Sequence, residues 1–285
     1  MAEGDTIYRI AAELRPVLVG RLVRAARART RSRVDRLVGA TVSSIETAGK
    51  NLLIHFSNGL SVRTHLGMTG TWHHYRPVEA WRRPAARAAL VLEVDGAVAV
   101  CFDAPVVELL ETRALAIHPV LSALGPDLLD PGFEPALALA RLRQAGPVVA
   151  TIGEALLDQR ILAGIGNVYR SEILFIERVN PFAPIDALAD PELERLIETA
   201  LRLLRANVAD EPGRDRPVDR RPAPGRTTTG FAREAAGSAL WVYRKTGRPC
   251  RRCGTPIRVA SLGREKARWV WWCPRCQASP ETAVH

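Results

Sequence analysis

Apolar segments rich in β-branched residues dominate residues 1–126 and predict a domain built mainly of strands. Asn58-Gly59 lies between the segments LLIHF and LSVRTHL, and Asp95-Gly96 lies between LVLEV and AVAVCF. Asn-Gly and Asp-Gly pairs favour the positive φ angles of two-residue hairpin turns. The sequence therefore predicts two β-hairpins with these pairs at their tips.

A helix is predicted ahead of the hairpins. Apolar residues recur at helical spacing over 7–18. Asp5 or Thr6 can cap the start of this helix, and Gly20 can end it. Pro16 falls inside the pattern, so we expect a kink or an early end there.

Beyond residue 135 the apolar period becomes helical. The Pro- and Gly-rich stretch 125–135 is interpreted as a linker, and Asp190-Pro191 predicts the start of a helix. The apolar face of that helix is predicted to hold Leu193, Leu196, Ile197, Ala200 and Leu204. Residues 210–237 are rich in Arg, Pro, Gly, Asp and Thr without an apolar period, which indicates a mobile loop.

Positive charge is concentrated near the C-terminal end. The net charge is +10, and the segment 241–285 holds ten Lys or Arg against two Glu. Such a basic field captures polyanions, so nucleic acid is the expected partner; a solvated surface on an Arg-rich protein is the alternative. The sequence has no apolar run long enough to span a membrane and no secretory segment, so we expect a cytoplasmic protein.

Four of the five cysteines form two C-x-x-C pairs, Cys250/Cys253 and Cys273/Cys276, with nineteen residues between the pairs. This spacing suits a tetrahedral site for one structural Zn²⁺, because four thiolates leave no coordination position open for catalysis. An iron–sulfur or rubredoxin-like iron site and a redox role are the alternatives. Cys101 lies in the apolar run AVAVCF and is predicted to be a buried thiol in a reducing compartment.

The segments IRVASL and WVWW between the cysteine pairs predict two strands of a β-ribbon. Arg264 and Arg268 lie on this ribbon, where Arg beside exposed aromatic surface suits phosphate contact. The alternative is that Trp269, Trp271 and Trp272 only pack the ribbon onto the helical domain. Because side chains alternate along a strand, both interpretations can hold on opposite faces.

The segment LLDQRILAGIGNVYRSEILF (156–175) is the second strong feature. LLDQR is predicted to end a helix, ILAGIGN to form a tight turn, and VYRSEILF to begin the next helix. Asn167 stands at the expected N-cap, where free backbone N–H groups suit a phosphate. Gly164 and Gly166 let the backbone approach a ligand closely. A plain connection between two helices is the alternative.

Together these features resemble the Fpg/Nei family of DNA glycosylases over nearly the whole chain, the loop 210–237 being the chief exception. LLDQRILAGIGNVYRSEILF resembles that family's helix–two-turn–helix, and the segment ending WWCPRCQ resembles its zinc β-ribbon. The start MAEGDT resembles its N-terminal P-E-G stretch. THLGMTG (64–70) resembles its intercalation loop, and TAGKNLLIHFSNG (47–59) resembles the neighbourhood of its catalytic lysine.

The resemblance implies an α+β fold in three parts. These are an N-terminal β-sandwich with a leading helix over 1–126, a helical domain with the helix–two-turn–helix over 127–245, and a zinc β-ribbon finger over 246–279. It also implies one structural Zn²⁺ ion, and a monomer that binds damaged, double-stranded DNA between the first two parts.

The resemblance also assigns catalytic roles. The N-terminal amine of Ala2, exposed by removal of Met1, would attack C1′ of the damaged nucleotide and form a Schiff base. An α-amino group is less basic than a lysine side chain, so a larger fraction of it is neutral at physiological pH. Glu3 would act as general acid and base beside it. Lys50 would bind phosphate and assist the elimination that breaks the strand.

The same resemblance implies the DNA-binding residues. Met68 would fill the gap left by the flipped nucleotide, while Asn167 and a finger arginine would hold phosphates beside the lesion. Arg268 stands five residues before Cys273, as the family spacing suggests, whereas Arg264 follows a Gly as in many members. We favour Arg268.

Departures from the family pattern refine the expected activity. The family usually has Pro where this chain has Ala2. It often has Glu where this chain has Thr6, and Asp5 could substitute for that glutamate. The stretch CFDAPVVELLE lacks the Arg-Phe pair of members specific for oxidised purines, which favours the endonuclease VIII side and oxidised pyrimidines. We therefore predict a bifunctional DNA glycosylase/AP lyase of base excision repair. A catalytically weak damaged-DNA or abasic-site binding protein of the same fold is the alternative, and an RNA-binding or transcription module is a third.

Overall fold

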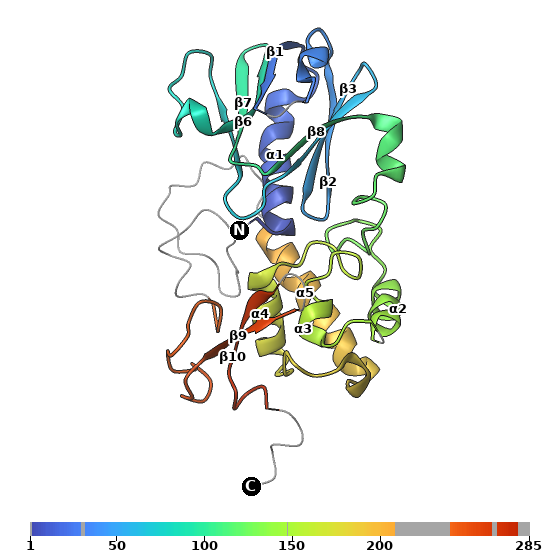
Figure 1. The fold of residues 1–285 in the computed structure, drawn as a ribbon, viewed down its shortest axis with the longest axis vertical. Helices are drawn as coiled ribbons and strands as arrows, with labels where there is room; N and C mark the ends of the chain where they lie inside the picture. The colour runs from blue at the N-terminus through green and yellow to red at the C-terminus, as the bar shows by residue number, and fades with distance from the viewer. Residues whose placement is uncertain (1, 30–31, 147, 209–239, 264–266, 279–285) are drawn as a thin grey trace. The chain divides into compact units, whose positions relative to one another are not determined.

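A computed structural model describes residues 2–29, 32–146, 148–208, 240–263 and 267–278. The chain divides into two compact units, one ending at Ala123 and the other beginning at Leu124 (Figure 1). The segment 210–237, predicted to be a mobile loop, lies outside the described residues. Within the described ranges, no helix combines the length and the apolar character needed to cross a membrane.

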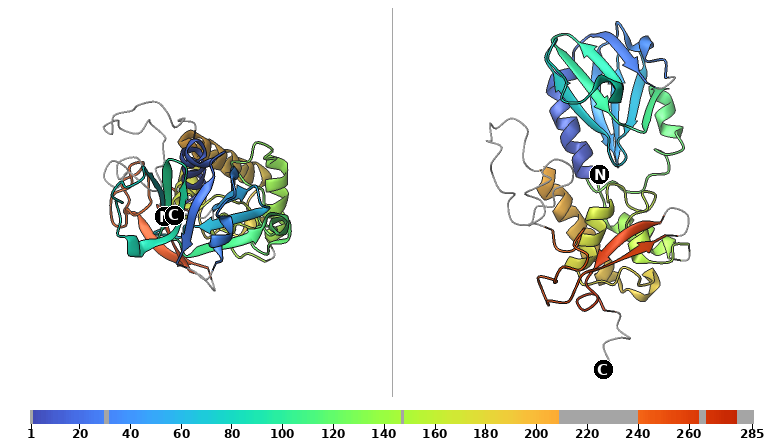
Figure 2. Two further views of the ribbon diagram at one scale, coloured as in Figure 1. Left: turned by 90° about the horizontal axis from the view of Figure 1, so that it is seen from above. Right: turned by 60° about the vertical axis from the view of Figure 1, so that its left-hand side comes forward.

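The first unit is a β-sandwich with a helix beside it (Figure 2). One antiparallel sheet has the strand order β1 (Val23–Ala28), β6 (Ala88–Val94), β7 (Ala97–Phe102) and β5 (Thr71–Tyr75). The other has the order β2 (Val42–Ala48), β3 (Asn51–Phe56), β4 (Leu60–His65) and β8 (Val106–Glu111). The apolar side chains of both sheets and of the helix form one core. The predicted β-sandwich with a leading helix is confirmed.

Both predicted hairpins are present. Asn58-Gly59 joins β3 to β4, and Asp95-Gly96 joins β6 to β7. Gly59 and Gly96 both have a φ of 77°, the left-handed conformation that such turns require. Cys101, on β7, is fully buried as predicted, and burial raises the pKa of its thiol far above the ordinary value.

The leading helix α1 (Gly4–Leu18) begins differently from the prediction, but it ends just before Gly20, which has a φ of 80°, as predicted. Its N-cap is Glu3, whereas Asp5 and Thr6 lie inside the first turn and are buried. Pro16 does not stop the helix early, because α1 continues to Leu18. The proline lies in the last turn, where its missing N–H removes a single helical hydrogen bond.

The second unit combines helices with a two-stranded ribbon. Its elements are α2 (Pro135–Ala145), α3 (Ile152–Ala155), α4 (Asn167–Ile176), α5 (Asp190–Val208), β9 (Arg258–Leu262) and β10 (Arg268–Trp272). The five residues predicted to form the apolar face of α5 are all buried. Figure 1 shows the ribbon beside α4. The predicted order of a β domain, helices and a terminal ribbon is confirmed.

Candidate functional site

The head of α1 holds the first two predicted catalytic residues. The backbone nitrogen of Ala2 donates a hydrogen bond of 3.4 Å to the carbonyl oxygen of Gly67. Glu3 is 0 % exposed, and its carbonyl oxygen accepts the first helical hydrogen bond, from the N–H of Ile7 at 3.1 Å. A glutamate withdrawn from water therefore stands next to the nitrogen that becomes an amine when Met1 is removed.

Met68 lies at the tip of the loop between β4 and β5. Its side chain is 63 % exposed, so it does not belong to the core. The loop is closed by a hydrogen bond of 2.9 Å from the N–H of Gly70 to the carbonyl of Leu66. Gly67 has a φ of 57°, and a Cβ atom there would come within 2.9 Å of the ring of Pro105. The loop therefore requires glycine at position 67, the residue whose carbonyl binds the Ala2 nitrogen.

Arg83 joins the Met68 loop to the turn after β7, a contact that the sequence did not predict. Its guanidinium donates to the carbonyl of Thr69 at 3.5 Å and to the carboxylate of Asp103 at 2.7 Å. Arg87 contacts the same carboxylate at 2.8 Å. Hydrogen bonds from Arg87 and Arg83 hold the pKa of Asp103 below its ordinary value. Asp103 lies in the stretch CFDAPVVELLE, where the Arg-Phe pair is absent.

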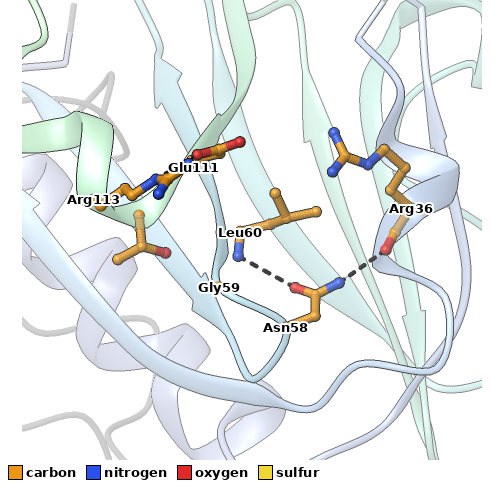
Figure 3. Close-up of a pocket in the computed structure, with 7 residues that line it drawn as sticks. Arg36, Asn58, Gly59, Leu60, Glu111 and Arg113 are labelled. Carbon is orange, nitrogen blue, oxygen red and sulfur yellow. Dashed lines mark hydrogen bonds and ion pairs between the residues drawn. The ribbon is translucent and has the colours of Figure 1, made fainter.

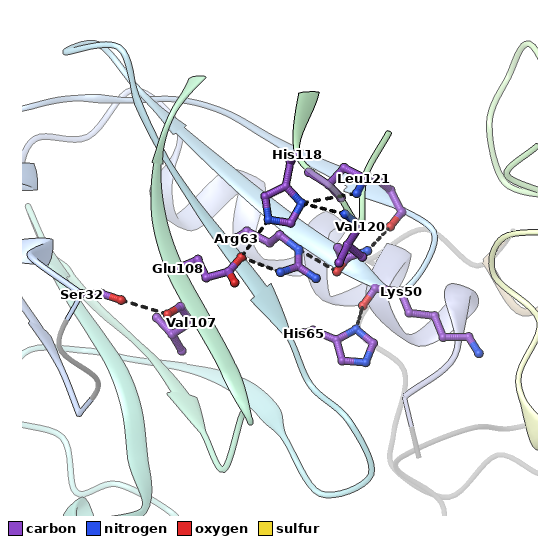
Figure 4. Close-up of polar contacts among 11 residues, drawn as sticks. Ser32, Lys50, Arg63, His65, Val107, Glu108, His118, Val120 and Leu121 are labelled. Carbon is purple, nitrogen blue, oxygen red and sulfur yellow. Dashed lines mark hydrogen bonds and ion pairs between the residues drawn. The ribbon is translucent and has the colours of Figure 1, made fainter. Parts of the chain in front are cut away.

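Lys50 occupies the two-residue turn between β2 and β3, after Gly49 at a φ of 56°. Its carbonyl oxygen accepts a hydrogen bond of 3.0 Å from Nδ1 of His65. Burial is the main cause that lowers the pKa of His65, which favours the neutral ring with its proton on Nδ1. Figure 4 shows the Lys50 side chain extending away from the polar network on the sheet. The turn is therefore fixed while its ammonium group points outward.

A chain of polar contacts supports this turn (Figure 4). Asn51 closes the turn with a hydrogen bond of 2.9 Å to the carbonyl of Ala48, and its Oδ1 accepts from Arg63 at 3.0 Å. Arg63 is nearly buried and contacts Glu108 at 2.6 Å. His118 lies 3.3 Å from the same carboxylate. Arg63, Glu108 and His118, which lie in three other segments of the chain, are thus linked to Asn51 at the start of β3.

A surface hollow of about 450 Å³ lies at the opposite end of β3 and β4 (Figure 3). Asn58 bonds there to the carbonyl of Arg36 at 2.9 Å and accepts from the N–H of Leu60 at 3.3 Å. Because Lys50 precedes β3 and Asn58 follows it, the hollow and Lys50 lie at opposite ends of the sheet. The hollow is therefore separate from the residues predicted to be catalytic.

In the second unit, consecutive turns precede α4. Helix α3 ends at Ala155, so residues 156–160 form turns and not the predicted end of a helix. The side chain of Gln159 donates to the carbonyl of Ile165 at 2.9 Å and accepts from the N–H of Gly164 at 3.1 Å. These contacts fold the connection onto itself and bring it to the start of α4.

Asn167 is the first residue of α4, and the N-cap is Gly166, one residue earlier than predicted. Asn167 is 5 % exposed, and its Oδ1 accepts a hydrogen bond from the guanidinium of Arg170. Arg170 also donates to the carbonyl of Trp269 on β10 at 3.0 Å. Arg170 lies one turn along the helix from Asn167, yet no local pattern in the sequence distinguishes it.

Glu172 fixes the chain as it enters the cysteine-bearing segment. Its buried carboxylate accepts hydrogen bonds from the backbone N–H groups of Trp241, Val242 and Tyr243 at 2.6, 3.0 and 2.9 Å. Burial raises the pKa of Glu172, and the three N–H groups oppose that shift. Helix α4 therefore holds this segment as well as β10.

The four predicted cysteine ligands come together. Their sulfur atoms all lie within 4.8 Å of one another, with 3.9 Å between Cys250 and Cys276 and 3.4 Å between Cys253 and Cys273. Four sulfurs around a tetrahedral Zn²⁺ lie roughly 3.8 Å apart, given Zn–S bonds of about 2.3 Å. The N–H groups of Arg252 and Cys276 point at cysteine sulfurs, as in C-x-x-C turns that hold a metal. The donor set fits one tetrahedral ion.

The ribbon presents Arg268 at the start of β10 with its side chain exposed. Trp271 packs against Tyr243 and Trp272 against Phe182, so these two tryptophans anchor the ribbon as the packing alternative suggested. Trp269 is 59 % exposed and does not share that role. Arg264, the other candidate finger arginine, lies outside the described residues.

Comparison with known proteins identifies the family. Two family models match the chain, namely the formamidopyrimidine-DNA glycosylase N-terminal domain over residues 1–105 and the H2TH domain over 124–215. A Streptomyces coelicolor protein named "Probable endonuclease 8 2" is 40 % identical over 287 residues, covering 98 % of this chain and 95 % of that protein. The chain therefore belongs to the Fpg/Nei family of DNA glycosylases.

A second relative agrees with this assignment, and a solved structure shares the fold. The Mycolicibacterium smegmatis protein named "DNA-(apurinic or apyrimidinic site) lyase Nei2" is 36 % identical, covering 98 % of this chain and 100 % of that protein. The crystal structure of Lactococcus lactis Fpg, bound non-covalently to DNA containing an AP site, superimposes with a TM-score of 0.79 at 21 % identity. It covers 97 % of this chain and 100 % of that chain. At that identity the similarity establishes a shared fold.

Proposed function

We propose that this protein is a bifunctional DNA glycosylase/AP lyase of base excision repair. The observation that carries the proposal is the arrangement at the head of α1. Buried Glu3 directly follows Ala2 in the chain, and the Ala2 nitrogen is bonded to the loop that exposes Met68. The names of the full-length relatives support the same activity. We further propose that the protein acts as a monomer on damaged double-stranded DNA in the cytoplasm.

The proposed reaction begins after removal of Met1. The free amine of Ala2 attacks C1′ of the damaged nucleotide, the bond from C1′ to the base breaks, and the departing base takes a proton supplied through Glu3. The amine then forms a Schiff base with the opened sugar. Loss of a proton from C2′ allows the C3′–O bond to break and releases the 3′ phosphate. Water finally hydrolyses the imine and frees the amine.

The proposed DNA contacts come from both units. Lys50 extends its ammonium group from a fixed turn and would bind a phosphate beside the reacting sugar. Met68 would enter the gap left by the flipped nucleotide. Asn167 at the start of α4 and Arg268 at the start of β10 would bind phosphates, the former aided by the helix N-terminus.

We propose that Cys250, Cys253, Cys273 and Cys276 hold one structural Zn²⁺. The four-thiolate donor set favours zinc, and a closed set of four protein ligands supplies structure and no reaction chemistry. The two-stranded ribbon has a small core, which contains ligand cysteines as well as Phe175, Val242 and Ile257. The ion would therefore provide much of the folding free energy of the segment that carries Arg268.

Oxidised pyrimidines are the proposed substrate class. The stretch CFDAPVVELLE (101–111) lacks the Arg-Phe pair of the purine-specific members, and its Asp103 is bound instead by Arg83 and Arg87. The relatives described above carry endonuclease 8 or AP lyase names, which supports that side of the family.

Borohydride trapping tests the lyase proposal directly. Protein shown by intact mass to lack Met1 is mixed with a duplex that contains an abasic site or thymine glycol, and the imine is reduced. We expect one covalent adduct per active protein and cleavage on the 3′ side of the lesion. Binding to the abasic duplex without an adduct would instead support the alternative, a damaged-DNA binding protein that retains the fold but not the chemistry.

A further inference from the structure

Arg170 is a fully buried arginine that joins three elements of the second unit. It is 0 % exposed. Its guanidinium donates to the carbonyl of Gly153 in α3 at 3.2 Å, to Oδ1 of Asn167 in α4, and to the carbonyls of Trp269 and Arg268 in β10 at 3.0 and 3.5 Å. Burying a guanidinium is costly unless hydrogen bonds replace its water. These contacts supply such bonds.

The contact with Asn167 determines how that amide is oriented. An asparagine side chain has one oxygen that accepts and one NH₂ group that donates, whereas a guanidinium has only donors. Arg170 must therefore face Oδ1, which turns the Nδ2 group of Asn167 away from the guanidinium. Phosphate oxygens only accept hydrogen bonds, so Nδ2 is the end of Asn167 that can bind a phosphate.

The same guanidinium fixes the backbone that carries the finger arginine. Its bonds to the carbonyls of Arg268 and Trp269 hold the start of β10 against α4. The side chain of Arg268 remains exposed. One buried residue thus sets both the orientation of the Asn167 amide and the place from which Arg268 extends.

We infer that Arg170 is a positioning residue for DNA binding: it presents the Asn167 NH₂ group to a phosphate and couples that contact to Arg268. This inference rests on the proposed function, because it takes Asn167 and Arg268 as phosphate-binding residues. Arg170 itself, being buried, touches no DNA. It acts through the two residues whose oxygens it binds.

Arg252 provides a matched control, because it also ties the cysteine-bearing segment to α4. Its guanidinium donates to the carbonyl of Phe175 at 3.1 Å and stacks over that ring at 4.5 Å. Within the described part of the chain, the hydrogen bonds and ring contacts of Arg252 involve Cys250, Phe175 and Trp241, and neither Asn167 nor β10. If Arg170 only fastened the finger to the helix, Arg252→Met would reproduce the effect of Arg170→Met.

The test is a double-mutant cycle on the full-length, zinc-loaded protein. The dissociation constant is measured by fluorescence anisotropy with a duplex that contains a tetrahydrofuran abasic-site analogue, and folding is followed by zinc content and melting temperature. We expect Asn167→Ala and Arg170→Met each to weaken binding about tenfold, the size of one hydrogen bond to a charged group. We expect the double variant to bind no more than about twofold weaker than Arg170→Met. Arg252→Met should bind within about twofold of wild type.

Two further variants keep the test decisive if Arg170→Met does not fold. Asn167→Asp retains the acceptor for Arg170 but has no NH₂ group, so it should fold and still lose at least tenfold in affinity. Arg170→Lys retains the charge but cannot donate to all three elements, and should lie between wild type and Asn167→Ala.

The outcomes separate this inference from the proposed function. Wild-type affinity for Asn167→Ala would remove the proposed phosphate contact itself. Weak binding by Asn167→Ala together with wild-type affinity for folded Arg170→Met, or for Arg170→Lys, would overturn the positioning role alone. If the losses of affinity in the double variant were fully additive, or if Arg252→Met lost as much affinity as Arg170→Met, Arg170 would only hold the ribbon to α4 and would not position Asn167.

Discussion

The backbone nitrogen of Ala2 donates a hydrogen bond of 3.4 Å to the carbonyl of Gly67. This contact ties the proposed nucleophile to the loop that exposes Met68, the side chain proposed to occupy the emptied position in the duplex. Because Gly67 is held in a left-handed conformation against Pro105, the carbonyl has a fixed place. In the proposed mechanism, insertion of Met68 and approach of the amine to C1′ would thus be coupled through Gly67.

The first prediction concerns the chemistry of the Ala2 nitrogen. A chain that keeps an uncleaved N-terminal tag has an amide at this position, and an amide is not a nucleophile. We expect such a chain to bind the abasic duplex and to form no adduct with borohydride, whereas the Met1-free chain forms one. Ala2→Pro, which supplies the amine usual in the family, should also be trapped. An adduct with the tagged chain would place the Schiff base on another amine.

The second prediction concerns Glu3. It is fully buried and directly follows Ala2 in the chain, so Glu3→Gln removes the acid and base group while preserving the size of the side chain. We expect release of thymine glycol to fall at least 100-fold, the lower limit for loss of a general acid or base, with affinity for the abasic analogue unchanged within about twofold. Comparable losses in affinity and melting temperature would instead make Glu3 a structural residue.

Local patterns predicted the elements but not the contacts that join them. Asn58-Gly59 and Asp95-Gly96 specify hairpins because turn chemistry acts over two residues, and the four cysteines specify a metal site because ligand type and spacing suffice. The path of α1 through Pro16 was missed, since a proline is tolerated in the last turn where few bonds remain to be broken.

In the candidate site, too, some residues could be predicted from the sequence and others could not. Ala2, Glu3, Lys50 and Met68 could be selected because they follow a known family order, and the structure places Ala2 beside the Met68 loop. Arg83 and Arg170 could not be selected. Their partners lie in other elements, and one Arg among many carries no local signal of burial or pairing. Such contacts depend on the tertiary fold.

The third prediction separates two arginines that share one carboxylate. Arg83 contacts both the Asp103 carboxylate and the carbonyl of Thr69. Arg87 contacts the Asp103 carboxylate but not Thr69. Arg83→Ala should free the Met68 loop and reduce the preference for abasic over undamaged duplex about three- to tenfold, the effect of losing about one positioning hydrogen bond. Arg87→Ala is the control and should change this preference by less than about twofold. Equal effects would show that the charge of Asp103, and not the loop, governs the preference.

The fourth prediction concerns the four cysteines. Wild-type protein should contain one zinc ion per chain, and Cys273→Ser should contain less than half of that, because Cys273 is a fully buried ligand that directly follows β10. Zinc binds thiolates, so lowering the pH should release the ion as protons compete for the sulfurs.

With the ion lost, β10 no longer presents Arg268, and affinity for the abasic duplex should fall at least tenfold. The β-sandwich has its own core, so its unfolding transition should persist in Cys273→Ser. A variant that lacks zinc and yet binds with wild-type affinity would show that the ribbon does not contribute to DNA binding.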